Sequence, residues 1–139
     1  MNDLFGKALA NYYQNPAKQE LVTWTNLTEE DPVPLSYFFR DFDGMPKLEQ
    51  KALELTRGKT LDIGCGSGSH SLYIQNNRSL AVTGLDISEG AISVAKSRGV
   101  KETVCSSIMD YTNEKYDTLL LLMNGLGVAK TLKGVYSLL

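Results

Sequence analysis

The sequence predicts an α/β fold in which a mostly parallel sheet is flanked by helices and preceded by a helical extension. Two observations support this prediction. Short apolar runs alternate with segments of helical spacing, and one of these runs passes directly into closely spaced glycines. The second arrangement is typical of a buried parallel strand that turns sharply into a helix. The apolar runs that predict strands begin near Thr60, Leu80, Glu102 and Tyr116.

The glycines follow the first of these runs, at Gly64, Gly66 and Gly68. Because glycine has no Cβ, these positions can adopt positive φ and let a ligand lie directly against the backbone. The second run ends in Asp86, 24 positions after Asp62 at the end of the first. A strand-helix-strand unit of about that length returns the chain to the neighbouring strand, so we expect Asp86 beside the glycines, within reach of ribose hydroxyls.

These two stretches resemble a known family. Residues 61–68 are similar to the first motif of class I S-adenosylmethionine-dependent methyltransferases, and residues 84–88 resemble the acidic ribose-binding motif of that family. The resemblance covers about Leu48 to the C-terminus. It implies a Rossmann-like methyltransferase fold with three layers, αβα, whose first four strands take the order 3-2-1-4. We therefore divide the chain into an N-terminal helical and aromatic extension, residues 1–45, and a cofactor-binding domain, residues 46–139.

The resemblance also implies the cofactor site. S-adenosyl-L-methionine is the cofactor and S-adenosyl-L-homocysteine the product. Asp62 would hold the methionine end, the glycine loop would approach the cofactor closely, Asp86 would bind the ribose and Ile87 would pack on the adenine. In the family an acidic residue often reaches the adenine amine. That acid is absent here, and the hydroxyl of Ser107 and the backbone amide of Ile108 would replace it. The full cofactor set is Asp62, Gly64, Cys65, Gly66, Gly68, Asp86, Ile87, Ser107, Ile108 and Asn124.

Asn124 follows the fourth apolar run, where open α/β sheets place their ligands. There it would lie beside the transferable methyl group, although Asn124-Gly125 is equally typical of a turn that ends a strand. Eight of the twelve aromatic residues precede Gly58. In the family this extension lies over the cofactor cleft, so the candidates for a substrate wall are Tyr37, Phe38, Phe39 and Arg40. The alternative is that these aromatics simply seal one edge of the sheet.

No catalytic residue is assigned. His70 is the single histidine, and we expect it to be a polar residue at a helix start rather than a general base. Methyl transfer in the family needs alignment of the reacting groups and exclusion of water more than an acid or a base. Two alternatives stay open: a cofactor-binding fragment without turnover, and an NAD(P)-binding oxidoreductase domain. The second would use the spacing G-x-G-x-x-G, whereas this loop reads G-x-G-x-G, and Asp62 would repel a pyrophosphate.

The composition limits the classes of partner that the protein is expected to bind. A net charge of −2 gives no electrostatic surface for nucleic acid, so we expect a small-molecule acceptor. The sequence predicts neither a signal peptide nor a membrane span, which suggests a cytoplasmic protein. Two cysteines, Cys65 and Cys105, make no metal-ligand cluster or disulfide framework.

Caps and spacing predict the helices. An apolar stripe places the first from about Asp3 to Gln14. A second is expected from about Pro46 to Arg57, ending at Gly58, with Leu48, Ala52 and Leu55 as its buried face. Ser69 and Ser88 are the expected N-caps of two further helices, and Gly99 should end the last of them.

The fourth strand contains five consecutive apolar residues, Leu119 to Met123, a pattern typical of a central strand buried on both faces. A complete sheet of this family has seven strands in the order 3-2-1-4-5-7-6, and this chain supplies four. We therefore expect an N-terminal fragment of a longer enzyme. The apolar edge of its fourth strand predicts a homo-oligomer in which a second copy covers that edge.

Overall fold

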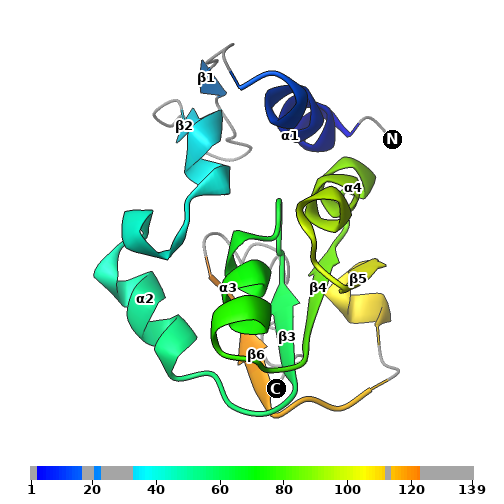
Figure 1. The fold of residues 1–139 in the computed structure, drawn as a ribbon. Helices are drawn as coiled ribbons and strands as arrows, with labels where there is room; N and C mark the ends of the chain where they lie inside the picture. Colours follow the sequence, from blue (N-terminus) through cyan, green and yellow to red (C-terminus); the bar gives the residue numbers. More distant parts are fainter. Residues whose placement is uncertain (1–2, 17–20, 23–32, 112–113, 123–139) are drawn as a thin grey trace.

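The structure is a computed structural model and describes residues 3–16, 21–22, 33–111 and 114–122. Its centre is a four-stranded parallel sheet, in which β3 lies between β4 and β6 and β5 forms one edge (Figure 1). The order β5-β4-β3-β6 is the predicted order 3-2-1-4. The strands are β3 (Thr60–Ile63), β4 (Val82–Asp86), β5 (Glu102–Cys105) and β6 (Thr118–Leu120).

Two helices connect the first three of these strands. They are α3 (Ser69–Asn77) and α4 (Glu89–Arg98), and α2 (Lys47–Glu54) precedes the sheet beside α3 (Figure 1). The core under α2 and α3 joins both helices to the sheet. Its buried members are Met45, Leu53, Ile74, Val82 and Leu120. The opposite face of the sheet buries a second cluster, made by Leu61, Ile63, Leu85 and Ile108.

The short helix η3 (Ile108–Asp110) belongs to that second face, where Tyr111 and Tyr116 also pack. The strand residues are divided between the two clusters because successive side chains along a strand point to opposite faces of the sheet. Asp62 and Gly84 are paired in the register and share the α3 face, whereas Leu61 and Ile63 share the other.

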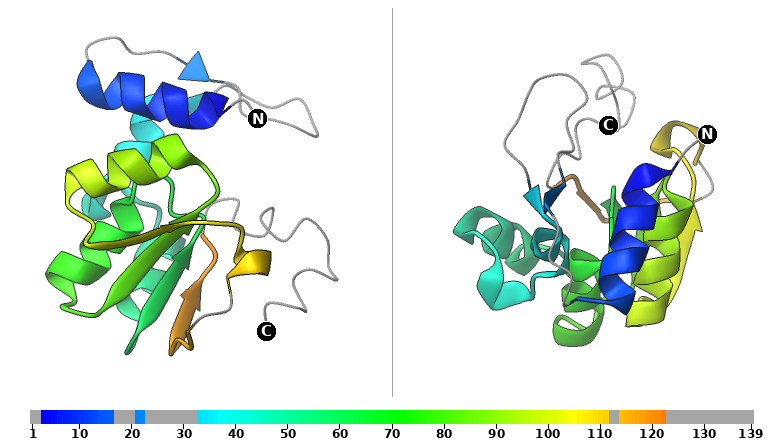
Figure 2. Two further views of the ribbon diagram at one scale, coloured as in Figure 1. Left: turned by 90° about the vertical axis from the view of Figure 1, so that its right-hand side faces the viewer. Right: turned by 90° about the horizontal axis from the view of Figure 1, so that it is seen from above.

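The N-terminal helix α1 (Leu4–Gln14) packs along α4, and both views in Figure 2 show the two helices side by side. Two glycines permit this approach, since a Cβ on Gly90 would lie 2.5 Å from the Cα of Gly6. Asp3 joins the two helices chemically. Its carboxylate accepts the N–H groups of Gly6 and Gly90, each at 2.9 Å, as well as the hydroxyl of Ser88.

Asp3 therefore caps the start of α1 and also satisfies a donor at the start of α4. Burial alone would raise the pKa of the Asp3 carboxyl, but hydrogen bonds from Gly90, Gly6 and Ser88 outweigh it and lower that pKa. Ser88 is the N-cap of α4, with its hydroxyl 3.0 Å from the N–H of Ala91, and Gly99 ends the helix in the left-handed region. Both caps were predicted from the sequence.

The predicted buried face of α2 is wrong at two of its three residues, because Ala52 packs against the core but the two leucines do not. Leu48 is 79% exposed and Leu55 is 64% exposed, whereas Glu49 and Leu53 are buried. The helix is rotated because Glu49 finds ionic partners inside the protein, so a charged side chain takes the place expected for a leucine. The helix also ends earlier than predicted, with Leu55 as its C-cap. Gly58 has a different role: with φ of +66°, it leaves space for the side chain of Asp117.

Two further expectations need correction. Ser69 does not cap α3, because Gly68 occupies the N-cap position in the left-handed region and the Ser69 hydroxyl points elsewhere. Leu119 is 40% exposed, so β6 is not buried on both faces along its described length; Leu120 is buried on the α2 side. The predicted central strand continued to Met123, which lies outside the described residues.

A short antiparallel pair, β1 (Leu21–Val22) and β2 (Val33–Pro34), leads into the 3₁₀ helices η1 (Leu35–Phe39) and η2 (Phe42–Gly44). These carry the chain from the neighbourhood of α1 to α2 across the carboxyl end of β3 (Figure 1). In the part of the chain that the structure describes, no helix has the length and apolar character needed to cross a bilayer.

Candidate functional site

The glycine loop between β3 and α3 has the predicted backbone. Gly64, Gly66 and Gly68 all have positive φ, at 74°, 58° and 90°. The second and third glycines serve different purposes. A Cβ on Gly66 would meet no heavy atom within 4 Å, whereas a Cβ on Gly68 would lie 2.8 Å from Val100 Cγ2 and 3.1 Å from Ala95 Cβ. Gly66 therefore faces open space beside the loop, and Gly68 lets the loop pack closely on α4.

Asp86 lies beside this loop at the carboxyl end of β4, as the spacing predicted. Its Oδ2 accepts the N–H of Gly66 at 2.8 Å, and its Oδ1 accepts the N–H of Ser88 at 2.9 Å. Burial raises the pKa of the Asp86 carboxyl, the two backbone N–H groups oppose that shift, and the nearby charge of Asp62 adds to it. Each carboxylate oxygen retains a lone pair that can accept a further hydroxyl donor.

The side chain of Asp62 is more deeply buried than that of Asp86. Only 1% of it is exposed, and its Oδ2 accepts the hydroxyl of Ser71 at 2.7 Å beneath the first turn of α3. Burial raises the pKa of the Asp62 carboxyl, although His70 and the Ser71 hydroxyl act in the opposite direction. Asp62 and Asp86 occupy the same face of the sheet, since Asp62 pairs with Gly84 and Asp86 lies two positions further along β4.

Cys65 lies between these two carboxylates and is buried. Burial and the charges of Asp62 and Asp86 raise the pKa of its thiol well above the ordinary value, so it stays neutral at physiological pH. The side chain also explains a glycine that the sequence did not account for. A Cβ on Gly84 would lie 3.0 Å from the sulfur of Cys65 and 3.2 Å from the hydroxyl of Ser71.

The residues expected to contact the adenine differ in their exposure and in their hydrogen bonds. Ile87 is 66% exposed directly after Asp86, leaving an apolar surface at the tip of β4. Ile108 buries its side chain in the core on the second face of the sheet, and the contact expected from its backbone amide stays a prediction. The Ser107 hydroxyl accepts the N–H of Met109 at 3.1 Å and caps η3. Asn124, assigned to the methyl group, lies outside the described residues.

The segment expected to form the substrate wall contacts the glycine loop, but not uniformly through its side chains. Phe38 turns its ring into the core between α1 and α4, 5.2 Å from the ring of Phe5, and its carbonyl faces the loop. Phe39 packs in the same core. Both rings are partly buried and pack against the core between α1 and α4, and their role as a substrate wall stays a prediction.

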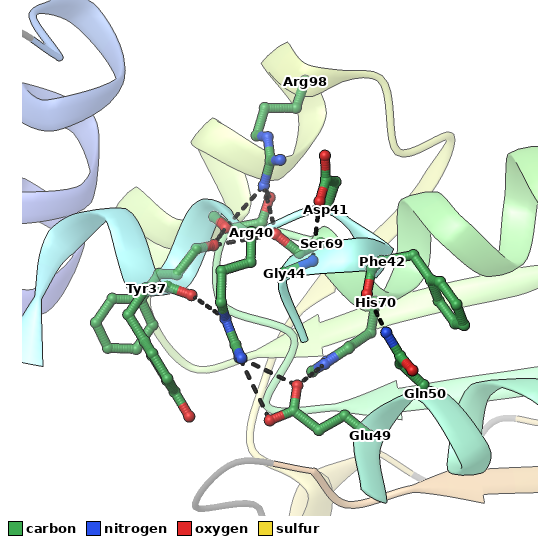
Figure 3. Close-up of polar contacts among 12 residues, drawn as sticks. Tyr37, Arg40, Asp41, Phe42, Gly44, Glu49, Gln50, Ser69, His70 and Arg98 are labelled. Atoms are coloured by element: carbon green, nitrogen blue, oxygen red, sulfur yellow. Dashed lines mark hydrogen bonds and ion pairs between the residues drawn. The ribbon is translucent and has the colours of Figure 1, made fainter. Parts of the chain in front are cut away.

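Arg40 is held by the protein itself. Its guanidinium lies over the ring of Tyr37 at 3.9 Å from the centroid, donates to the Tyr37 carbonyl at 2.7 Å, and forms an ion pair with Glu49 at 3.0 Å (Figure 3). Glu49 Oε1 also lies 2.9 Å from Nε2 of His70. His70 is thus a buried polar residue in the first turn of α3, as expected, with a carboxylate partner that was not expected.

Three residues of this region were missed from the sequence: Glu49, Arg98 and Ser67. The guanidinium of Arg98, at the end of α4, reaches the glycine loop and contacts Ser67. The spacing of α2 gave no signal for Glu49, because a buried acid on a helix looks like any surface acid in the sequence. Among the described residues, no group of three or more His, Cys, Asp or Glu side chains could hold a metal ion.

A separate hollow lies at the amino ends of the strands, away from the glycine loop. Its polar lining includes Lys59, Lys101, Glu102 and Glu114. Parallel sheets bind ligands outside the carboxyl ends of their strands, where Asp86 and the glycine loop are found. The carboxyl end is therefore the candidate site, and its geometry is that of a nucleoside-binding α/β protein.

The comparisons with known proteins define the family. The family model described as a methyltransferase domain matches residues 60–138. The solved structure of a SAM-dependent methyltransferase from Bacteroides fragilis, in complex with S-adenosyl-L-homocysteine, is 35% identical, with a TM-score of 0.83 over 95% of this chain and 55% of that chain. The chain therefore belongs to the methyltransferase domain family, and the class I resemblance drawn from residues 61–68 and 84–88 is confirmed.

A second solved structure, the plantazolicin methyltransferase BpumL in complex with SAH, is 24% identical, with a TM-score of 0.49 over 93% of this chain and 48% of that chain. The chain thus spans about half the length of the solved structures it matches. A comparison with curated protein sequences found no match.

Proposed function

We propose that this chain binds S-adenosyl-L-methionine at the carboxyl ends of β3 and β4, and that the protein transfers its methyl group to a small-molecule acceptor. One observation carries the proposal. Asp86 is fixed by the N–H groups of Gly66 and Ser88 at the mouth of a loop whose central glycine faces open space. A carboxylate with both oxygens oriented in this way is suited to accept the two hydroxyls of a ribose.

The neighbouring residues fit the rest of the cofactor. Gly66 leaves the space that a Cβ would fill, so a ligand can approach the backbone there. The exposed side chain of Ile87 offers an apolar surface on which an adenine ring would pack. Asp62, buried beneath the loop, would favour the methionine ammonium through its negative charge, and the low dielectric around it strengthens that attraction.

When bound, the cofactor supplies a methyl group on a positively charged sulfur, which is already activated for transfer. The chain must then hold the cofactor, orient the acceptor and exclude water. We assign the first task to Asp86, Gly66 and Asp62. The exposed part of Tyr37, held by Arg40, is the described element of the extension best placed to contact an acceptor.

The 35% identical Bacteroides fragilis methyltransferase, which was crystallised with S-adenosyl-L-homocysteine, supports the choice of cofactor. A dinucleotide is the alternative. It is disfavoured because the loop reads G-x-G-x-G rather than the G-x-G-x-x-G of a pyrophosphate site, and because the carboxylate of Asp62 beneath the loop would repel a pyrophosphate.

Titration calorimetry of the chain with S-adenosyl-L-homocysteine tests the proposal, with NADH as the competing ligand. We expect saturable binding of the first and none of the second. The variant Gly66→Ala should weaken binding, because its methyl group enters the proposed ligand space and its positive φ strains the loop. Gly68→Ala should lower the unfolding temperature further than Gly66→Ala does, because its methyl group also meets Val100. Binding of NADH, with no binding of S-adenosyl-L-homocysteine, would overturn the proposal.

A radiolabelled methyl-transfer assay with pooled small-molecule acceptors separates an active enzyme from a cofactor-binding domain without turnover.

Association through the sheet edge at β6 and the cytoplasmic location stay predictions, as does the domain boundary at residue 45. The half-exposed Leu119 on β6 is compatible with self-association. Light scattering tests it, and a monomer over a wide concentration range would count against a dimer.

A further inference from the structure

Arg98 links the end of α4 to the glycine loop. Its Nη1 lies 3.0 Å from the carbonyl oxygen of Ser67, 2.8 Å from the Ser67 hydroxyl and 3.0 Å from the Ser69 hydroxyl (Figure 3). Its guanidinium also lies over the ring of Phe39, 5.0 Å from the centroid. One side chain thus contacts two positions of the loop and one of the N-terminal extension.

The two serine hydroxyls continue the connection. Each accepts from Arg98, and each donates its own proton to the carbonyl oxygen of Phe38, at 3.1 Å for Ser69. The two hydroxyl protons match the two lone pairs of the Phe38 carbonyl oxygen, whereas the two N–H groups of Nη1 are shared among three acceptors, the Ser67 carbonyl and the two hydroxyls. Hydrogen bonds arranged in such a chain strengthen one another, and the positive guanidinium polarises both hydroxyls toward Phe38.

The loop needs such a connection. Ser67 lies between Gly66 and Gly68, and glycines with positive φ impose little conformational preference of their own. Ser67 is nevertheless only 2% exposed, so its position is fixed by contacts with other segments. Those contacts come from Arg98 and the Phe38 carbonyl, which are distant in sequence from the loop.

We propose that Arg98 is a positioning residue of the cofactor site: acting through Ser67 and Ser69, it holds the glycine loop in its binding conformation and couples that loop to the extension at Phe38. The inference rests on the proposed function, because it concerns affinity for the same cofactor. It assigns Arg98 no contact with the cofactor. It predicts that docking of η1 and binding of the cofactor support each other, since both require the same loop conformation.

The test is the affinity of the 139-residue chain for S-adenosyl-L-homocysteine, measured by titration calorimetry. We expect Arg98→Met to weaken binding about tenfold, because the variant keeps the apolar stem but loses charge-assisted hydrogen bonds. Lys96→Met is the matched control. It removes the same charge from the same last turn of α4, at an exposed position, and should leave affinity unchanged.

A double-mutant cycle distinguishes positioning from general destabilisation. The Ser67→Ala/Ser69→Ala variant removes the two hydroxyls through which Arg98 acts and leaves only its hydrogen bond to the Ser67 carbonyl, so adding Arg98→Met to it should cost less affinity than Arg98→Met costs in the wild type. Arg98→Lys should bind with intermediate affinity, because a point charge can reach one hydroxyl but does not reproduce the planar guanidinium. Thermal unfolding of each variant without ligand confirms that the measured proteins are folded.

The outcomes are distinct. Wild-type binding with an unchanged affinity in Arg98→Met overturns this inference and leaves the proposed function intact. Additive losses in the cycle also overturn it, since Arg98 would then act independently of the two serines. A wild-type chain that does not bind S-adenosyl-L-homocysteine overturns the proposed function and this inference together.

Discussion

Replacing Asp86 by alanine is the most direct perturbation of the proposed ribose site. In the structure its two oxygens are oriented by Gly66 and Ser88, so the free lone pairs point to fixed positions. Hydrogen bonds from ligand hydroxyls to such a carboxylate contribute about 1–3 kcal/mol in total, which corresponds to a loss of affinity of about 5- to 150-fold. We expect this loss for S-adenosyl-L-homocysteine in titration calorimetry at neutral pH.

Glu89→Ala provides the control, because it removes the same charge three positions away at an exposed site. The pH dependence adds an independent signature. Burial raises the pKa of Asp86 above the ordinary 3.8, so on acidification its accepting, ionised form is lost at a higher pH than for an ordinary aspartate. Wild-type affinity should therefore fall in mild acid, and Asp86→Ala should lack that component. If Asp86→Ala binds with an affinity within about twofold of wild type, the free-energy difference is smaller than that of one hydrogen bond, and the assignment of Asp86 to the ribose is refuted.

Four further substitutions concern stability. Burial raises the pKa of Asp62, so the ionised form of this side chain opposes folding. Asp62→Asn, which can still accept the Ser71 hydroxyl, should therefore raise the unfolding free energy measured in urea titrations at neutral pH. This gain in stability should shrink as pH falls toward 3.8. Gly90→Ala should cost about 1–3 kcal/mol in the same assay despite its better helix propensity, because its Cβ would meet α1 at 2.5 Å. Gly44→Ala, where the nearest atom is 3.6 Å away, should change stability by less than about 1 kcal/mol. Asp3→Ala should cost about 1–2 kcal/mol, because it removes the N-cap of α1 and the acceptor of the Gly90 N–H at the start of α4. Since hydrogen bonds lower the pKa of Asp3, its contribution to thermal stability should persist at neutral pH and disappear only as pH falls through that lowered value. Equal unfolding temperatures of wild type and Asp3→Ala at neutral pH would contradict the last expectation.

Local signals explain what the sequence predicted. The strand-glycine-helix-strand pattern placed Asp86 beside the glycine loop because the length of a crossover unit is set by the geometry of one helix between adjacent strands. Ser88 and Gly99 were identified as caps because capping depends on the residue itself and its immediate backbone.

The residues that were missed depend on contacts between distant segments. Buried Glu49 forms an ion pair with Arg40 and lies within hydrogen-bond distance of Nε2 of His70, and neither partner is visible from the spacing of α2. Its burial rotates the helix and leaves Leu48 exposed. Arg98 contacts Ser67 and Ser69, which only the folded chain brings to it, so its sequence position at a helix end gave no signal for these contacts.

The close packing of Gly84 against the buried sulfur of Cys65 has a consequence for sequence variation across the family. The two positions share one small volume, so a bulkier residue at either requires a smaller one at the other. Relatives with a larger side chain at the position of Cys65 should retain glycine in the middle of β4, whereas those with a glycine or alanine there could tolerate alanine or serine in the strand. Covariation of this pair would then reflect steric exclusion beneath the ligand loop rather than any direct contact with the ligand.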